Sequence, residues 1–221
     1  DKMNFIGILI SYLYITLVIV GGKIFEKRGK EASRKFIHIM LGNWWFIAMY
    51  YFTNVWFAMF VPITFVIINF LSYKKGIIKV MEREKQDGLG TVYYAISLLI
   101  LVIVSFGIFN KPSLGLIPCL VMAYGDGFAA VFGKIIKSKK YQIYGSTKSI
   151  AGSLTMFIVA TLLIGGYLAF THKMVFWGSG RWPLISLMMA YVITTIEAVS
   201  GKGTDNITVP LGTLGMLLLI G

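Results

Sequence analysis

The chain has 221 residues, of which 57% are hydrophobic and 14% charged. Soluble domains carry about a quarter of charged residues, so this composition excludes an ordinary soluble domain and is typical of a polytopic membrane protein. A net charge of +12 would suggest a nucleic-acid partner in a soluble protein, but here we expect the membrane as the partner and no nucleic acid. The single cysteine, Cys119, excludes an internal disulfide and a cysteine metal cluster.

Apolar runs recur along the whole chain. A helix needs roughly 20 apolar residues to cross the hydrocarbon core of a membrane. We therefore expect an all-α polytopic fold with about eight transmembrane helices, or seven and a re-entrant segment, because the last apolar run is short. Residues 1–221 are expected to form a single transmembrane catalytic domain. The predicted spans are about 4–22, 36–53, 55–72, 92–109, 113–132, 150–170, 182–200 and 207–220.

Basic residues are distributed unevenly between the predicted loops. All but four of the 21 lysines and arginines fall in the loops that follow the first, third, fifth and seventh spans. The four exceptions are Lys2, Lys111, Lys173 and Arg181. Basic loops of membrane proteins lie mainly in the cytoplasm, so we expect the lysine-rich loops there and both termini outside. The expected location is the cell membrane of a bacterium or an archaeon.

The second predicted span opens with the sequence RKFIH. If its helix begins near Ser33, Arg34 and His38 lie four residues apart on one face, with Lys35 beside them. Basic side chains at a helix start oppose the helix dipole, and a bound anion would remove that conflict. The alternative is ordinary anchoring of a cytoplasmic helix end, which accounts for the two basic residues but leaves His38 unexplained.

The fifth predicted span contains an aspartate between two glycines. Gly125–Gly127 is expected to loosen the helix near its cytoplasmic end, because glycine weakens helix interiors. Asp126 is followed at helical spacing by small residues, namely Ala129, Ala130 and Gly133. A carboxylate at this depth needs a positive partner, and Mg²⁺ bound through one or two carboxylates and substrate phosphates would provide it. The alternative is an aspartate paired with a lysine for structure alone.

The sequence GSTKS, residues 145–149, precedes the sixth predicted span. It offers backbone N–H groups, three hydroxyls and an ammonium group at a helix start, which is a general arrangement for holding phosphate. It lacks the spacing of a Walker A motif.

A further acidic cluster surrounds the start of the last span: Glu197 lies near the end of the seventh span, and Asp205 and Asn206 lie in a Gly-rich turn. Asp205 is a second oxygen donor on the side of Asp126, or else part of a structural turn.

Together these features suit metal-assisted phosphoryl or nucleotidyl transfer from a soluble nucleotide to a lipid, with Mg²⁺ and cations neutralising phosphate charge. An ion-coupled transporter is the alternative from another class, with Asp126 and Glu197 binding a cation near the midplane. Against it, the polar residues gather at one face of the membrane.

The order of the motifs resembles one membrane family. That family contains dolichol kinase, phytol kinase and CTP-dependent diacylglycerol kinase, and it is distantly similar to phosphatidate cytidylyltransferases. The resemblance covers roughly residues 30 to 212 and lies in the combination of motifs. These are RKFIH at 34–38, DGLGTVYY at 87–94, GDGFAAVFGK at 125–134, YGSTKSIAGS at 144–153 and DNITVPL at 205–211.

The resemblance implies transfer of the terminal phosphate of CTP to a lipid alcohol, such as a polyprenol, phytol or diacylglycerol, at the cytoplasmic face. A cytidylyltransferase-like nucleotidyl transfer is the enzymatic alternative. The implied catalytic residues are Asp126, Asp205 and His38, with Asp126 and Asp205 as Mg²⁺ ligands. The implied nucleotide-binding residues are Arg34, Lys35, Gly125, Lys134, Ser146, Thr147, Lys148, Ser149 and Asn206. The chain departs from the family pattern at Ala151, where an acidic residue is common, and Glu197 is a candidate to replace it.

Overall fold

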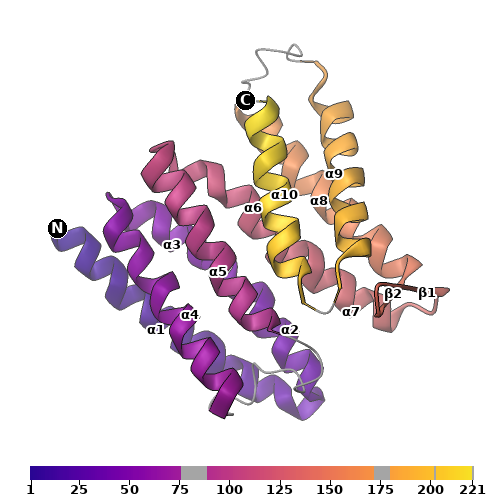
Figure 1. Ribbon diagram of the computed structural model, residues 1–221, viewed down its shortest axis with the longest axis horizontal. Helices are drawn as coiled ribbons and strands as arrows, with labels where there is room; N and C mark the ends of the chain where they lie inside the picture. Colours follow the sequence, from indigo (N-terminus) through magenta and orange to yellow (C-terminus); the bar gives the residue numbers. More distant parts are fainter. Residues whose placement is uncertain (76–88, 172–179, 202, 221) are drawn as a thin grey trace.

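The computed structural model describes residues 1–75, 89–171, 180–201 and 203–220 of the chain. Its regular structure is helical apart from one antiparallel hairpin, as expected for an all-α membrane protein (Figure 1). The principal elements are α1 (Lys2–Phe25), α2 (Lys30–Leu41), α3 (Trp44–Tyr51), α4 (Val55–Lys75), α5 (Gly90–Val102), α6 (Leu116–Leu120), α7 (Gly127–Ile135), β1 (Lys140–Ile143), β2 (Ser146–Ser149), α8 (Ile150–Thr171), α9 (Trp182–Val199) and α10 (Asp205–Ile220).

Six helical segments of the described chain are long and apolar enough to cross a membrane. They are Lys2–Arg28, Val55–Lys75, Gly90–Ile108, Pro112–Ile135, Ile150–Thr171 and Trp182–Val199. The two other predicted spans also correspond to helices, but to shorter ones. The span at 207–220 is the 16-residue α10, and the span at 36–53 is divided into α2 and α3.

The division between α2 and α3 has a packing cause. A side chain at Gly42 would collide with Ala123, so this glycine allows the segment before α7 to approach closely. Asn43 accepts a hydrogen bond from the Tyr124 hydroxyl at 2.8 Å across the same contact. The segment that carries Asp126 therefore packs against the break between α2 and α3. This contact holds α2 and α7 together.

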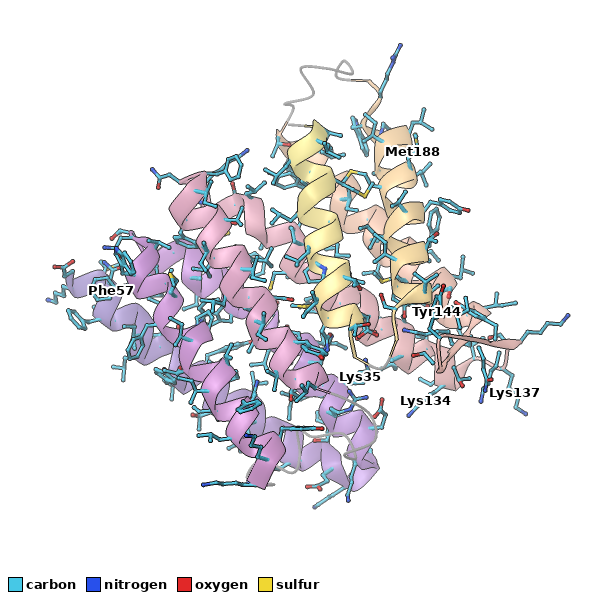
Figure 2. All side chains as sticks on the ribbon, viewed as in Figure 1. Lys35, Phe57, Lys134, Lys137, Tyr144 and Met188 are labelled. Carbon is cyan, nitrogen blue, oxygen red and sulfur yellow. The ribbon has the colours of Figure 1, made fainter. Side chains whose placement is uncertain are left out.

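The outer surfaces of the helices are apolar. On α1, residues spaced about one helical turn apart are more than half exposed, namely Phe5, Leu9, Leu13, Leu17, Val20 and Ile24. The opposite face of α1 is buried and carries small or polar residues such as Gly7 and Ser11. A continuous exposed apolar stripe of this kind faces lipid, and small residues let helices pack closely inside a membrane. Figure 2 shows the same outward placement for Met188 on α9.

The polar end of the molecule is built from segments far apart in the sequence. The end of α7, the β1–β2 hairpin and the connection from α9 to α10 lie side by side at the lower right of Figure 1. The N-terminus lies at the left of that view and the C-terminus at the top, away from the hairpin. Lys134, Lys137 and Tyr144 all project from this end of the molecule (Figure 2).

Candidate active site

The GSTKS segment forms a strand, and this corrects the prediction that it opens a helix. Tyr144 and Gly145 both adopt positive φ angles of 46° and 76°, as a two-residue hairpin turn requires. Ser146–Ser149 then pairs with Lys140–Ile143, and α8 begins only at Ile150. The alternation of side chains along β2 directs Lys148 toward α9 and α10, where it meets two carboxylates.

The first N–H groups of α8 are already occupied. Ser149 Oγ accepts from the Gly152 amide at 3.1 Å, which makes Ser149 the N-terminal cap of the helix. Ser138 Oγ accepts from the Ala151 amide at 3.1 Å, and the Lys139 carbonyl accepts from Ile150 at 3.0 Å. The predicted phosphate cradle of helix-start amides is therefore absent from these three positions. Any anion at this end must be held by side chains and by the hairpin.

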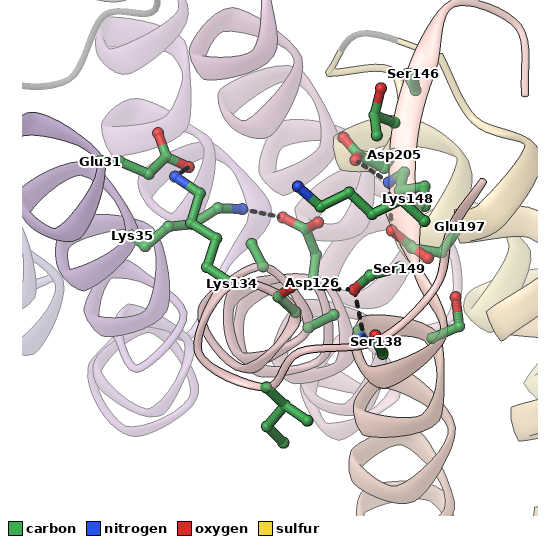
Figure 3. A pocket seen from close by; sticks show the side chains of 18 of the residues that line it. Glu31, Lys35, Asp126, Lys134, Ser138, Ser146, Lys148, Ser149, Glu197 and Asp205 are labelled. Atoms are coloured by element: carbon green, nitrogen blue, oxygen red, sulfur yellow. Dashed lines mark hydrogen bonds and ion pairs between the residues drawn. The ribbon is translucent and has the colours of Figure 1, made fainter. Parts of the chain in front are cut away.

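A cavity of about 730 Å³ opens between α2, α7, the hairpin and the start of α10 (Figure 3). This volume lies within the range of about 300–1,000 Å³ that is usual for sites of small ligands and cofactors. The small residues predicted to share a face with Asp126, Ala129, Ala130 and Gly133, do line it. Nine of the predicted site residues line it as well: Arg34, Lys35, Asp126, Lys134, Ser146, Thr147, Lys148, Ser149 and Asp205.

Three buried carboxylates meet at the floor of this cavity. Oxygens of Asp126, Glu197 and Asp205 lie within 4.8 Å of one another, although the residues come from the segment before α7, the end of α9 and the start of α10. Each residue is at most 5% exposed. The carboxylate of Asp205 lies in the first turn of α10, where the helix dipole favours negative charge. Hard oxygen donors in this arrangement are suited to a divalent cation.

Asp126 is compensated by two residues of α2. Lys35 Nζ lies 2.9 Å from Asp126 Oδ2, and His38 Nε2 lies 3.3 Å from the same oxygen. His38 Nε2 also lies 3.1 Å from the Met122 carbonyl. A carbonyl only accepts, so the contact with Met122 requires the form of the ring that is protonated on Nε2. His38 contacts Asp126 from α2 and is not among the described residues that line the cavity, and its catalytic role stays a prediction.

Lys148 connects the other two carboxylates. Its ammonium group contacts Glu197 and lies 3.3 Å from Asp205 Oδ2 (Figure 3). Burial lowers the pKa of Lys148, but the carboxylates of Glu197 and Asp205 outweigh it and hold the pKa above its ordinary value. The side chain of Lys148 is therefore a fixed positive charge at neutral pH.

Glu31, at the rim of the cavity, is not among the site residues predicted from the sequence. Glu31 accepts hydrogen bonds from Arg34 Nε at 3.1 Å and from Arg34 Nη2 at 2.5 Å, and Lys134 Nζ lies 3.8 Å away. Burial raises the pKa of Glu31, but Arg34 and Lys134 outweigh it, so the pKa lies below its ordinary value. The spacing of Glu31 and Arg34, three apart on a helix, was the available signal.

Asp126 lies at the end of a π-helical segment, Val121–Asp126, which agrees with the predicted loosening of this helix. A side chain on Gly125 would lie 2.6 Å from Met156 Sδ, and one on Gly127 would collide with Ile39. These glycines thus let the segment pack between α8 and α2. Gly125 faces α8 and is not among the described residues of the cavity wall, contrary to its predicted contact with nucleotide.

Asn206 is also placed differently from the prediction. It is missing from the cavity wall as far as the structure describes it, and its side-chain amide donates to the Gly90 carbonyl at 2.9 Å. Ser97 Oγ donates to the Asn206 carbonyl at 2.5 Å. Asn206 therefore ties α10 to α5 and sets the position of its neighbour Asp205. Residues 87 and 88 of the DGLGTVYY motif lie outside the described residues.

Comparisons with known proteins test the predicted family. No protein-family model matches the chain, and no solved structure matches it. The chain is 29% identical to a phytol kinase of Synechocystis sp. over 94% of its own length and 88% of that protein. It is 30% identical to a probable chloroplastic phytol kinase of Triticum aestivum, over 86% of this chain and 68% of the relative. The chain therefore belongs to the family of membrane lipid kinases that contains phytol kinase, as the five motifs predicted.

Proposed function

We propose that the chain is a CTP-dependent lipid kinase, which transfers the terminal phosphate of CTP to the hydroxyl of a long-chain lipid alcohol at the cytoplasmic face of the membrane. The observation that carries this proposal is the cavity in which buried carboxylates face a cationic rim at one end of the helix bundle. The family relationship supports the kinase reaction, and the names of the relatives favour an isoprenoid alcohol such as phytol as acceptor.

The cavity has the charge that a triphosphate requires. Arg34 and Lys134 stand on one side of it and Lys148 on the other, on the hairpin. Ser146 and Thr147 add hydroxyl groups from the same strand. Phosphoryl transfer depends mainly on positioning and on neutralisation of phosphate charge, and these side chains would supply both. An ion-coupled transporter is disfavoured, because the carboxylates face a cavity at one end of the bundle.

The donor set fits a divalent cation. The oxygens of the three carboxylates lie within 4.8 Å of one another, so one cation could contact more than one of them, and carboxylate oxygens are ligands that Mg²⁺ prefers. In this proposal Asp126 and Asp205 hold Mg²⁺, which when bound would neutralise the phosphate charge and polarise the transferred group.

The remaining polar groups have distinct tasks. Lys35 and His38 hold the carboxylate of Asp126 in one orientation from α2. Asp205 would also accept the proton of the acceptor hydroxyl, since it lines the cavity and its carboxylate has two oxygens. Ile136 lines the cavity and is half exposed, so an apolar edge is available to a lipid chain where α7 ends.

The test is identification of the product. Purified protein is incubated with each nucleoside triphosphate, labelled on either the α- or the γ-phosphate, together with phytol, farnesol, a polyprenol or diacylglycerol. We expect γ-label from CTP to appear on one class of alcohol as a monophosphate, with release of CDP. Transfer of α-label with release of pyrophosphate would instead identify a cytidylyltransferase, and equal use of ATP would refute the dependence on CTP.

A further inference from the structure

Glu197 is the carboxylate at the cavity floor to which the reaction proposed above gives no task. It lies near the end of α9, is 3% exposed and lines the cavity. A buried carboxylate is costly unless it is paired and hydrogen-bonded. Its partner is Lys148, which lies 49 residues earlier on strand β2. The pair therefore links the hairpin to the helix that ends beside it.

The contacts of Lys148 and Asp126 divide the site into two halves. Lys35 and His38 reach Asp126 from α2. Lys148 reaches Glu197 and Asp205 from the hairpin (Figure 3). Of its two carboxylates, Glu197 gives Lys148 the closer contact. Glu197 is thus the principal counterion of Lys148, and Asp205 is the secondary one.

The position of Lys148 on a short, exposed hairpin explains why it needs such a partner. It lies on a four-residue strand whose neighbours Tyr144 and Thr147 are exposed. A free lysine side chain has many rotamers of similar energy, so it would sample many positions around an exposed hairpin. A buried carboxylate on a rigid helix restricts it to one position, with the side chain only 17% exposed.

We propose that Glu197 is a positioning residue that acts through Lys148: it holds the ammonium group at the cavity floor beside Asp205, where a nucleotide phosphate would meet it. The identity of that nucleotide rests on the proposed function. The competing role for Glu197 is that of a third ligand to a divalent cation, and the experiments below separate the two.

The first experiment needs no substrate. The intact protein is treated with limiting acetic anhydride, and modification of each lysine is quantified by peptide mass spectrometry in the wild type and in Glu197→Gln. We expect modification of Lys148 to rise about tenfold or more once its counterion is removed, with Lys35 unchanged. Glu31→Gln is the matched control, because it removes a cavity carboxylate that contacts Arg34 and Lys134. Unchanged reactivity of Lys148 in Glu197→Gln would overturn the proposal, whatever the protein phosphorylates.

The second experiment is a double-mutant cycle on the KM for CTP. Glu197→Gln should raise this KM about tenfold, and it should add nothing in the background of Lys148→Met, because it acts through the lysine. Glu197→Asp, which keeps the charge, should restore part of the affinity and serves if the glutamine variant folds poorly. If the effects of the two substitutions on the KM were additive, the proposal would be overturned. It would also be overturned if adding Glu197→Gln to Lys148→Met raised the Mg²⁺ requirement, because Glu197 would then be a metal ligand. A chain that phosphorylates no lipid would refute the proposed function and leave the first experiment valid.

Discussion

Charge pairing between distant residues shapes this site. Asp126 finds its partners in Lys35 and His38, and the hydrogen bond from Lys35 spans 91 residues of sequence. Removing one member of a buried pair leaves an uncompensated charge and costs about 3–5 kcal/mol. At the rim, Glu31 and Lys134 are more exposed, and solvent weakens such pairs. Glu31 is the rim residue of most interest, because it contacts two cations that a phosphate would need.

Glu31→Gln is expected to lower the KM for the nucleotide about two- to fivefold. The substitution frees Arg34 and Lys134 from a competing carboxylate, and an exposed pair of this kind is worth up to about 1 kcal/mol. The pKa of Glu31 is lowered, so its negative charge is present at neutral pH and is lost only as the pH falls below the ordinary range of a glutamate. The difference in KM should thus be constant between about pH 6 and 8. A KM that rises would mean that Glu31 itself contacts the nucleotide.

The sequence was sufficient to identify Asp126 and to state that it needs a positive partner. It could not show which lysine, because Lys35 reaches it only through the packing of α2 on α7. The same limit applies to Gly125 and Asn206, which belong to the right motifs but face neighbouring helices. A motif can predict that a residue is important to the site. Only the packing of the helices decides whether that residue contacts the substrate or holds another residue in place.

Among the elements, the contact between α7 and α8 determines where the hairpin lies. A side chain on Gly152 would lie 2.9 Å from the Ala129 carbonyl, and one on Gly133 would lie 2.7 Å from Ser149 Oγ. The two helices therefore approach so closely that only glycine fits between them. The hairpin was not predicted, because its four-residue strands are polar and the apolar pattern of a buried strand is missing. The helices themselves were predictable from their long apolar runs.

Gly152→Val is expected to lower the melting temperature of the detergent-solubilised protein and to weaken nucleotide binding. The added side chain forces α7 and α8 apart, which costs about 1–3 kcal/mol, and it displaces the strand that carries Lys148. Gly166→Val on the same helix is the control, because no described atom lies within 4 Å of a side chain there. Equal melting temperatures for the two variants would contradict this description of the contact.

On the scale of the whole molecule, the helices bring every cavity element to one end. The chain leaves the site along α5, reaches Lys111 at the far end and returns through α6 to Asp126 and α7. The lysine-rich segments around the hairpin lie at the site end. The positive-inside rule then predicts that the cavity opens to the cytoplasm, where soluble nucleotides are available.

Cysteine labelling in intact cells tests this orientation. The native Cys119 is fully buried and is the chain's single cysteine, so the unmodified protein provides a low background. We expect Lys111→Cys to react with a membrane-impermeant maleimide from outside the cell. Tyr144→Cys, at a hairpin position that is 82% exposed, should react only after permeabilisation. The reverse pattern would place the cavity outside the cell and exclude CTP as donor.

The most direct test of the account is divalent-cation binding by the purified protein in the presence of CTP, followed with Mn²⁺ by electron paramagnetic resonance. The wild type should hold one Mn²⁺ together with the nucleotide. Asp126→Asn should weaken this binding about 100-fold or more and abolish lipid phosphorylation, with Asp205→Asn as the second variant and the exposed Glu26→Gln as the control. Mn²⁺ binding of wild-type strength in folded Asp126→Asn and Asp205→Asn proteins would contradict a metal-bound triphosphate at these carboxylates.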